Sequence, residues 1–314
     1  MLAYIIRRIL LVIPTMVGII FIIFVIMELT PGDPALIMLG NKATPEAVQQ
    51  IHEELNLDAP FFVRFFDYLV DLVKHGDMGT SYTTSRPVTQ ELMTRLPTTI
   101  KLATFSIIIA VVIGVPLGVI SAVKQYSIFD IFGVATATIL ASVPPFWFGL
   151  MAILLFSLKL GLLPSNGTDS FVHYILPSVT LGATTLASLL RMTRATMLET
   201  LREDYINTVR AKGQTERAVV FAHGLKNAVL PVVTVTGMEF GWLLGGALVI
   251  EQIFSINGLG TLMIDAIRSQ DLPVVMGSCI VLAFFFVLVM LLVDIIYALI
   301  DPRVRSRYVK GARV

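Results

Sequence analysis

A carboxylate within an apolar stretch is the first candidate for chemistry in this sequence. Glu239 is the only charged residue in the run 227–250. A carboxylate so deep in an apolar run is costly to bury, and it usually faces a cavity or a partner. Two roles stay open. In the first role, Glu239 lines a transport path and meets a positive group of the substrate. In the second role, Glu239 is structural: it pairs with Arg191 or Arg194, or burial keeps its carboxyl group neutral.

Sequence motifs of catalytic sites are absent. There is no GxxxxGK[ST] run that would cradle a nucleotide phosphate, and no GxSxG run that would carry a nucleophilic serine. The four histidines are scattered, with no HExxH motif and no Cys/His cluster; they are His52, His75, His173 and His223. We therefore predict that the chain is not an enzyme and that it holds no metal or cofactor of its own.

Glycines recur at helical spacing in two apolar stretches. Gly237, Gly241 and Gly245 are four residues apart, as are Gly114 and Gly118. Glycines at this spacing form a flat helix face against which a second helix packs closely. We predict helix packing at these positions, with a hinge as the alternative.

The composition shows which environment these stretches require. Hydrophobic residues make up 56% of the 314 residues and charged residues only 14%, with a mean hydropathy of +0.83. Soluble domains are nearer to about a quarter charged. The net charge of +1 offers no clustered basic face for nucleic acid. The chain is therefore expected to be an all-α integral membrane protein.

Six charge-poor stretches are long enough to cross a bilayer, which takes about 20 apolar residues. They are 9–27, 102–123, 131–158, 170–190, 227–250 and 272–293. The first follows Arg7 and Arg8 like a signal peptide, but its 19 residues and the lack of a cleavage motif favour a retained helix. We expect a first transmembrane helix over 1–29, an extracytoplasmic helical segment over 30–99, and a core of five transmembrane helices over 100–314.

Basic residues predict the orientation. With both termini in the cytoplasm, the inner segments hold Arg7, Arg8, Lys124, Arg191, Arg194, Arg202, Arg210, Lys212, Arg217, Lys226, Arg303, Arg305, Arg307, Lys310 and Arg313. The short outer loops then hold only Lys159 and Arg268. Positive residues concentrate on the cytoplasmic side of membrane proteins, so both termini are expected there.

The segment 30–101 is predicted to hold two short helices. Thr44 and Pro45 suit the N-cap and first position of a helix, and an apolar stripe follows them. A second helix is expected over 61–73, with one aromatic-rich side; that side consists of Phe62, Phe65, Phe66 and Leu69. These helices either lie on the membrane surface or the bundle, or receive an extracytoplasmic partner.

The segment 192–226 is basic and predicted to be a helical hairpin. A helix over 202–212 would stop at Gly213, and Thr215 would cap the next helix. A membrane protein seldom builds such a hairpin unless something binds it. A solvated basic loop that faces lipid is the alternative.

Motifs in this hairpin are similar to those of a known family. The runs Asp204-Tyr205-Ile206-Asn207-Thr208-Val209-Arg210-Ala211-Lys212-Gly213 and His223-Gly224-Leu225-Lys226-Asn227-Ala228-Val229-Leu230-Pro231 resemble the cytoplasmic EAA loop of ABC importer permeases, most of all the first permease of the dipeptide/oligopeptide (peptide/nickel) family. Further matches are Pro31-Gly32-Asp33-Pro34, Gly76-Asp77-Met78-Gly79, Ser142-Val143-Pro144-Pro145-Phe146, Glu251-Gln252-Ile253-Phe254 and Asp301-Pro302-Arg303.

The resemblance implies a type I ABC importer permease fold in which the EAA loop docks on a separate ATPase subunit. It assigns ATPase coupling to Asp204, Tyr205, Arg210, Ala211, Lys212 and Gly213. Thr208-Val209 stands where the family has a pair of small residues, which leaves the fine geometry of the hairpin open. The translocation path would include Glu239, Gly241, Pro144 and Phe146.

The resemblance also implies partners and a place in the cell. A second homologous permease, two ATP-binding subunits that hold ATP and Mg, an extracytoplasmic substrate-binding protein and membrane lipid are expected, in the cytoplasmic (inner) membrane of a bacterium or archaeon. Di- and oligopeptides are the expected cargo, with nickel, glutathione or another small solute as alternatives. A self-sufficient secondary transporter and an assembly protein that moves nothing are the rival classes.

Overall fold

A computed structural model describes residues 2–40 and 43–300 of the chain. The motif Asp301-Pro302-Arg303 and the basic residues that follow it lie outside the described residues. The described part is helical, with a single isolated β-bridge between Thr80 and Pro87. Contacts divide the chain into two compact units. The first unit holds 1–9, 100–256 and 286–314, and the second holds 10–99 and 257–285.

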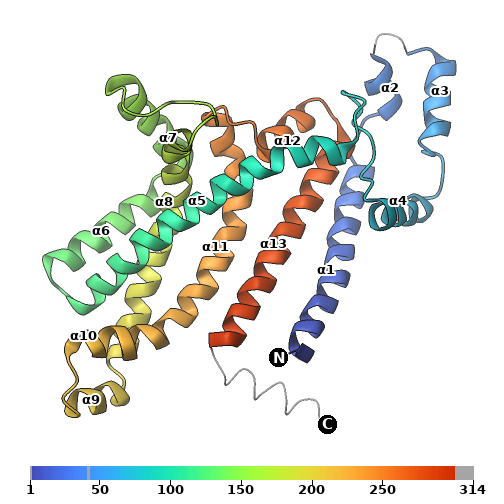
Figure 1. Cartoon of the computed structure of the whole chain (residues 1–314). Coiled ribbons are helices and arrows are strands. Elements are labelled where there is room, and N and C mark those ends of the chain that lie inside the picture. Colours follow the sequence, from blue (N-terminus) through green and yellow to red (C-terminus); the bar gives the residue numbers. More distant parts are fainter. Residues whose placement is uncertain (1, 41–42, 301–314) are drawn as a thin grey trace. The chain divides into compact units, whose positions relative to one another are not determined.

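Four long helices of the first unit form its bundle. They are α5 (Val88–Val123, from residue 100 in this unit), α6 (Ile128–Ser142), α8 (Phe171–Leu201) and α11 (Lys226–Ile253). Figure 1 shows α8 between α6 and α11, in agreement with their contacts. A short hairpin of α9 (Asp204–Ala211) and α10 (Glu216–Ala218) joins α8 to α11, at the end of this unit opposite α7 (Pro145–Ala152).

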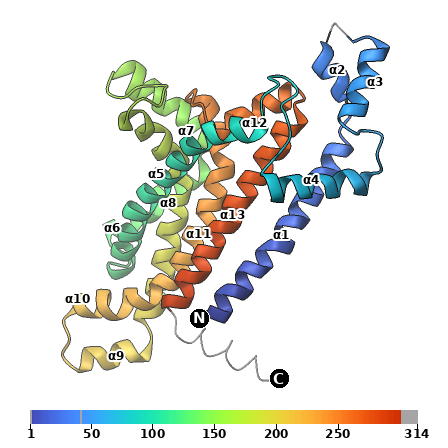
Figure 2. The same cartoon turned by 45° about the vertical axis from the view of Figure 1, so that its right-hand side comes forward.

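The second unit is built around α1 (Leu2–Glu28) and the first half of α13 (Leu272–Ile300). Short helices follow α1 in the chain, and a further one precedes α13; they are α2 (Pro34–Leu39), α3 (Pro45–Glu54), α4 (Phe61–His75) and α12 (Leu259–Arg268). Figure 2 shows α4 lying across α1 near the end of that helix. Phe24, Phe65 and Ile280 are buried in the apolar cluster of this unit.

Within residues 2–40 and 43–300, five helices are long and apolar enough to cross a membrane, and the number is six if a bent pair is counted as one span. The bent pair consists of α6 and the segment Pro145–Lys159, which ends in the π-helix η2 (Ile153–Lys159), with an angle of 102° between the two arms. A continuous helix over 131–158 was therefore the wrong prediction. Pro144 and Pro145 explain the break, because each lacks a backbone N–H and Pro145 pushes the residue before it out of the helical region.

Several helices extend beyond the uncharged windows that predicted them. Helix α5 begins at Val88 rather than near residue 102, and α8 continues to Leu201, past the predicted end at residue 190. An uncharged window detects only the membrane-facing part of a helix, so polar turns at its ends go unseen.

The short helices of the second unit begin as their capping residues predict. Thr44 accepts a hydrogen bond from the Ala47 backbone and Pro45 occupies the first turn of α3, which confirms that start. The sequence analysis missed α2. Its signal was present, because Asp33 caps α2 by accepting from the Ala35 backbone at 2.9 Å, and Pro34 follows.

Candidate functional site: the helical hairpin and the interior of the bundle

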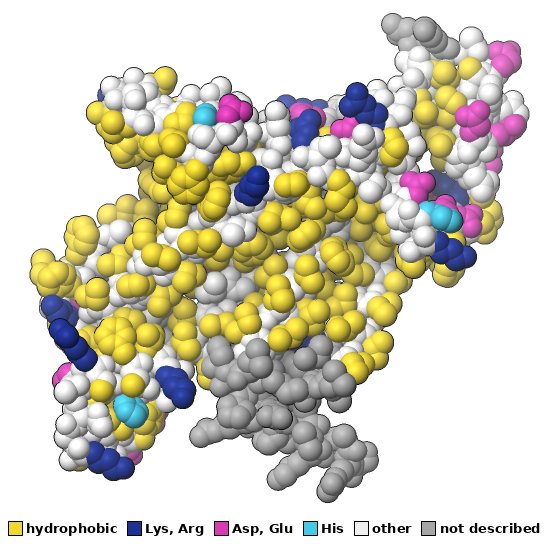
Figure 3. Space-filling model, in the orientation of Figure 1, with side chains coloured by type: hydrophobic (Ala, Val, Ile, Leu, Met, Phe, Trp, Pro, Cys, Tyr) yellow, Lys and Arg dark blue, Asp and Glu magenta, His cyan; other side chains and the backbone are white. Residues whose placement is uncertain are grey.

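The hairpin presents the residues that were assigned to ATPase coupling on its surface. Asp204, Tyr205, Arg210, Ala211, Lys212 and Gly213 are all exposed. In contrast, Ile206 in the same helix is fully buried. Figure 3 shows charged side chains on the hairpin and mainly hydrophobic side chains over the helices above it in the first unit. Helix α9 is therefore anchored by one apolar side chain and leaves a polar surface free.

Tyr205 ties α9 to the start of α11. Its hydroxyl accepts a hydrogen bond from the Asn227 side-chain amide at 2.7 Å and lies 3.4 Å from the backbone oxygen of His223. The π-helix η3 (Val219–Leu225) connects α10 to α11, and its Val220 packs with Met197 of α8 and Ala228 of α11 in a buried cluster. These contacts give the hairpin a stiff attachment to two membrane helices.

The turn between α9 and α10 depends on Gly213. This glycine has φ of +79°. This left-handed conformation is energetically unfavourable for residues that carry a Cβ atom. Arg210 before the turn pairs with Glu216 after it, with Nε–Oε1 at 3.0 Å, and Thr215 caps α10 by accepting from the Ala218 backbone. The stop at Gly213 and the cap at Thr215 follow the sequence prediction.

An ion pair joins the first turn of α6 to α8, with a buried carboxylate and a partly exposed arginine. Arg194 of α8 donates two hydrogen bonds to Asp130 of α6, with Nε–Oδ1 at 2.7 Å and Nη2–Oδ2 at 2.9 Å. Asp130 is 3% exposed, and it also accepts from the Ser121 hydroxyl and the Tyr126 backbone. One carboxylate therefore joins the end of α5, the turn after it, α6 and α8.

Glu239 has a different partner from those expected. Its Oε2 accepts a hydrogen bond from the Thr185 hydroxyl of α8 at 3.0 Å. Arg194 pairs with Asp130 instead, and Arg191 is exposed. Glu239 is half-buried, so it stands between two helices and is held by a neutral hydroxyl.

The other residues predicted for the translocation path lie on different elements. Pro144 and Phe146 are exposed at the bend between α6 and α7. Gly241 lies on α11, where a Cβ would overlap the ring of Phe286 of α13. The structure thus places Glu239 and Gly241 on α11 and the two bend residues on another span.

Glycines allow close approach between helices of the first unit. A Cβ at Gly118 would lie 2.6 Å from Thr193 Cβ and 2.7 Å from the Leu190 backbone oxygen, and one at Gly114 would lie 2.9 Å from the Leu186 oxygen. A Cβ at Gly237 would overlap Val293. Gly245 differs, because no described atom lies within 4 Å of its Cβ position, so the packing predicted there has no counterpart among the described contacts.

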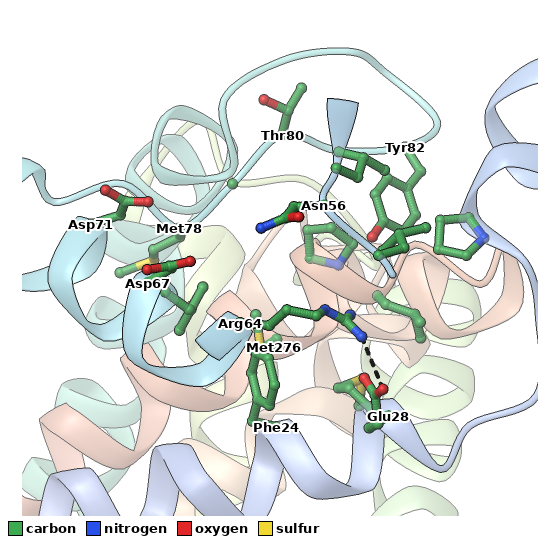
Figure 4. Close-up of a pocket in the computed structure, with 18 of the residues that line it drawn as sticks. Phe24, Glu28, Asn56, Arg64, Asp67, Asp71, Met78, Thr80, Tyr82 and Met276 are labelled. Carbon is green, nitrogen blue, oxygen red and sulfur yellow. Dashed lines mark hydrogen bonds and ion pairs between the residues drawn. The ribbon is translucent and has the colours of Figure 1, made fainter. Parts of the chain in front are cut away.

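The second unit contains a cavity of about 810 Å³. Figure 4 shows Arg64 of α4 reaching Glu28 of α1, with Asp67 and Asp71 along the same helix. Other lining residues include Glu54, Asn56, Asp77, Thr80 and Tyr82. The sequence analysis missed this cavity, because its walls come from segments far apart in the chain.

Burial and hydrogen bonding shift the pKa values of two groups in the segment 30–99. A hydrogen bond with His52 at 2.9 Å lowers the pKa of Asp33, whereas burial raises the pKa of Tyr82 to about 12. Asp271, just before α13, is buried and accepts from the Ser81 hydroxyl and from the backbone and hydroxyl of Thr83. This carboxylate fixes the loop that leads into α5.

The bundle has the fold of a known class of membrane transporter subunit. A solved structure of the MetNI methionine ABC transporter matches with a TM-score of 0.55 at 20% identity, covering 68% of this chain and 97% of that one. An amino acid ABC transporter matches with a TM-score of 0.51 at 15% identity, covering 68% of this chain and 94% of that one. The fold is therefore that of an ABC importer permease.

Sequence comparisons identify the family. The inner membrane component of binding-protein-dependent transport systems matches residues 114–306, and the N-terminal part of such components matches residues 1–103. The chain belongs to this family. It is a multi-pass permease subunit of an ABC importer in the inner membrane and not an enzyme, since ATP hydrolysis belongs to a separate subunit.

Curated relatives match over their whole length. A glutathione transport system permease protein, GsiC, of Pectobacterium atrosepticum is 41% identical over 98% of this chain and 100% of its own. A dipeptide transport system permease protein, DppB, of Alkalihalophilus pseudofirmus is 41% identical over 97% of this chain and 100% of its own. The predicted resemblance to the peptide/nickel permeases is confirmed.

Proposed function

We propose that this chain forms half of the translocation path of an ATP-driven importer of di- and oligopeptides. A second homologous permease forms the other half, two ATPase subunits bind below the hairpin, and an extracytoplasmic binding protein delivers the substrate. The observation that carries the proposal is the exposed hairpin fixed between α8 and α11 of an ABC permease fold.

The choice of cargo rests on the relatives. One is named for dipeptides and another for glutathione, at the same identity of 41%. Glutathione is itself a short peptide with an ammonium and carboxylates, so both names indicate peptide-like solutes. Glutathione is therefore the second candidate, and uptake of a labelled dipeptide with and without excess glutathione separates the two.

The stiffness of the hairpin supports the coupling role. A short helix held rigidly between two membrane helices transmits a push that a flexible loop would absorb. Tyr205 is fixed to the start of α11, Ile206 is buried, and Arg210 braces the turn through Glu216. Movement of a docked ATPase would reach α8 and α11 directly.

The orientation follows from this role. If α9 docks on a cytoplasmic ATPase, then the basic hairpin and both termini are cytoplasmic and the segment 30–99 is extracytoplasmic. The excess of arginine and lysine near the hairpin supports the same orientation. The segments 1–29 and 100–314 would then supply one and five transmembrane helices.

Substitutions at Gly213 test the coupling surface. Gly213→Val places a β-branched side chain at φ of +79° and should distort the turn, whereas Gly213→Asn should be tolerated because asparagine adopts this conformation readily. We expect Gly213→Val to lose most of the ATPase subunits on purification in mild detergent, while the second permease and the Gly213→Asn complex are retained. Equal recovery of ATPase with both variants would show that the turn is not a coupling element.

Glu239 offers a test of the translocation path. Glutamine at this position can still accept a hydrogen bond from Thr185, so Glu239→Gln should leave the bundle folded. If the carboxylate meets the substrate's ammonium, uptake should fall about tenfold, as expected for loss of a charge-assisted hydrogen bond. Thr185→Val is the control that keeps the charge. Unchanged uptake of several peptides by Glu239→Gln would exclude substrate contact.

A further inference from the structure

Helix α4 has three different faces. With 3.6 residues per turn, its side chains fall into three sectors of roughly a third of the circumference each. Phe61, Phe65, Tyr68, Leu69 and Leu72 pack against the rest of the second unit. The next sector is apolar and exposed; it consists of Phe62, Val63, Phe66, Val70 and Val73. The last sector is charged and includes Arg64, Asp67, Asp71 and Lys74.

The exposed apolar sector of α4 is larger than expected for a helix surface in contact with water. Phe62 is 62% exposed, Phe66 61% and Val73 80%. Soluble surfaces rarely leave so many large apolar side chains together on one face. The sector therefore needs a cover outside this chain's second unit.

Contacts with α1 set the depth of α4 in the bilayer. Arg64 pairs with Glu28 at 2.9 Å, and Glu28 is the last residue of α1, just after the uncharged run 9–27. Rings of Phe21 and Phe65 meet edge to face with centroids 5.3 Å apart, within the last two turns of that run. Helix α4 therefore crosses α1 where the membrane span ends (Figure 2).

The charged sector faces an aqueous space. Arg64, Asp67 and Asp71 line the cavity of about 810 Å³, as Figure 4 shows. Val70 also lines this cavity, whereas Phe62, Phe66 and Val73 of the exposed apolar sector do not. Helix α1 also exposes large apolar side chains in its last two turns, where Ile22 is 59% and Ile26 53% exposed.

We propose that α4 is an interfacial helix that lies on the outer end of the bilayer and inserts Phe62, Phe66 and Val73 among lipid chains. Helices with an apolar face and a charged face lie in the membrane interface in this way. Lipid is the occupant because α4 crosses α1 where its membrane span ends, and because no charge interrupts Phe62, Phe66 and Val73 as the polar rim of a protein interface would. The proposal does not depend on the cargo or on the coupling hairpin.

Neighbouring residues of α4 supply matched probes. In a Cys279→Ser background, spin labels are placed in pairs one residue apart, at F66C and D67C and at V73C and K74C. The complete transporter in lipid nanodiscs is exposed to oxygen, which partitions into lipid, and to a water-soluble nickel chelate. The cysteine-free background in this chain gives the baseline signal.

Lipid contact predicts opposite results within each pair. The ratio of oxygen to nickel accessibility should be several-fold higher at F66C and V73C than at the neighbouring charged positions. Nickel access at both members of a pair would show that the sector faces water. Immobile labels shielded from both reagents at the apolar positions would show that a protein covers it. Either result would overturn the proposal.

Discussion

Replacing Asp130 with asparagine should destabilise the first unit by about 3 kcal/mol, near the lower end of the cost of breaking a buried ion pair. The lower end applies because the Arg194 side chain is 24% exposed and keeps some solvent. The variant removes the negative charge and replaces one of the two acceptor oxygens with an NH2 group, so one of the two arginine hydrogen bonds loses its acceptor. The measurement is the unfolding midpoint of the purified complex in detergent.

The partner residue provides the controls for Asp130. Arg194→Gln should cost as much as Asp130→Asn, because it leaves the nearly buried carboxylate without its cation. The double variant should cost less than the sum of the single ones, since neither charge is then left unpaired. A midpoint for Asp130→Asn equal to that of the unchanged chain would show that the pair does not hold α6 against α8.

Replacing Gly118 with leucine should be the second large effect. The new Cβ would lie 2.6 Å from Thr193 Cβ and 2.7 Å from a backbone oxygen of α8, so α5 and α8 must move apart. Overpacking of this kind costs about 1–3 kcal/mol, and here a backbone atom cannot turn aside. We expect a marked fall in the yield of monodisperse protein and a lower unfolding midpoint.

Gly245→Leu is the matched control for Gly118→Leu. Both glycines lie in long helices, but the Cβ position at Gly245 has no described neighbour within 4 Å. Leucine favours helix over glycine by about 1 kcal/mol, so this variant should be neutral or slightly stabilising within the chain itself. An equal fall in yield and unfolding midpoint for both variants would show that Gly118 is not required for close packing of α5 against α8.

The sequence predicted which segments form long apolar helices better than it predicted where those helices begin and end. Uncharged stretches near 20 residues indicate which segments can cross a bilayer: five of the predicted stretches coincide with long apolar helices of the described residues, and the sixth coincides with the bent pair. The polar first turns of α5 and the last turns of α8 lie outside such windows, so these helices were predicted too short. The break at Pro144-Pro145 had a local signal in the prolines, but hydropathy alone favoured one long helix.

Contacts between distant residues were beyond the sequence analysis. In the sequence, Asp130 and Arg194 are two charged residues near the ends of different apolar stretches. Only the packing of α6 on α8 brings them together. For the same reason Arg191 and Arg194 were named as possible partners of Glu239, whereas its hydrogen bond in the structure is with Thr185 of α8. The hairpin was predictable because its signals are local: a glycine stop, a threonine cap and a short motif.

The most direct test of the central claim is uptake of a labelled dipeptide into proteoliposomes. They contain this chain with its second permease and ATPases, and ATP hydrolysis is followed in the same sample. The account predicts uptake only with ATP and the binding protein, and loss of uptake with Gly213→Val but not with Gly213→Asn. Uptake by this chain alone, without ATP, would contradict the account and identify a self-sufficient transporter.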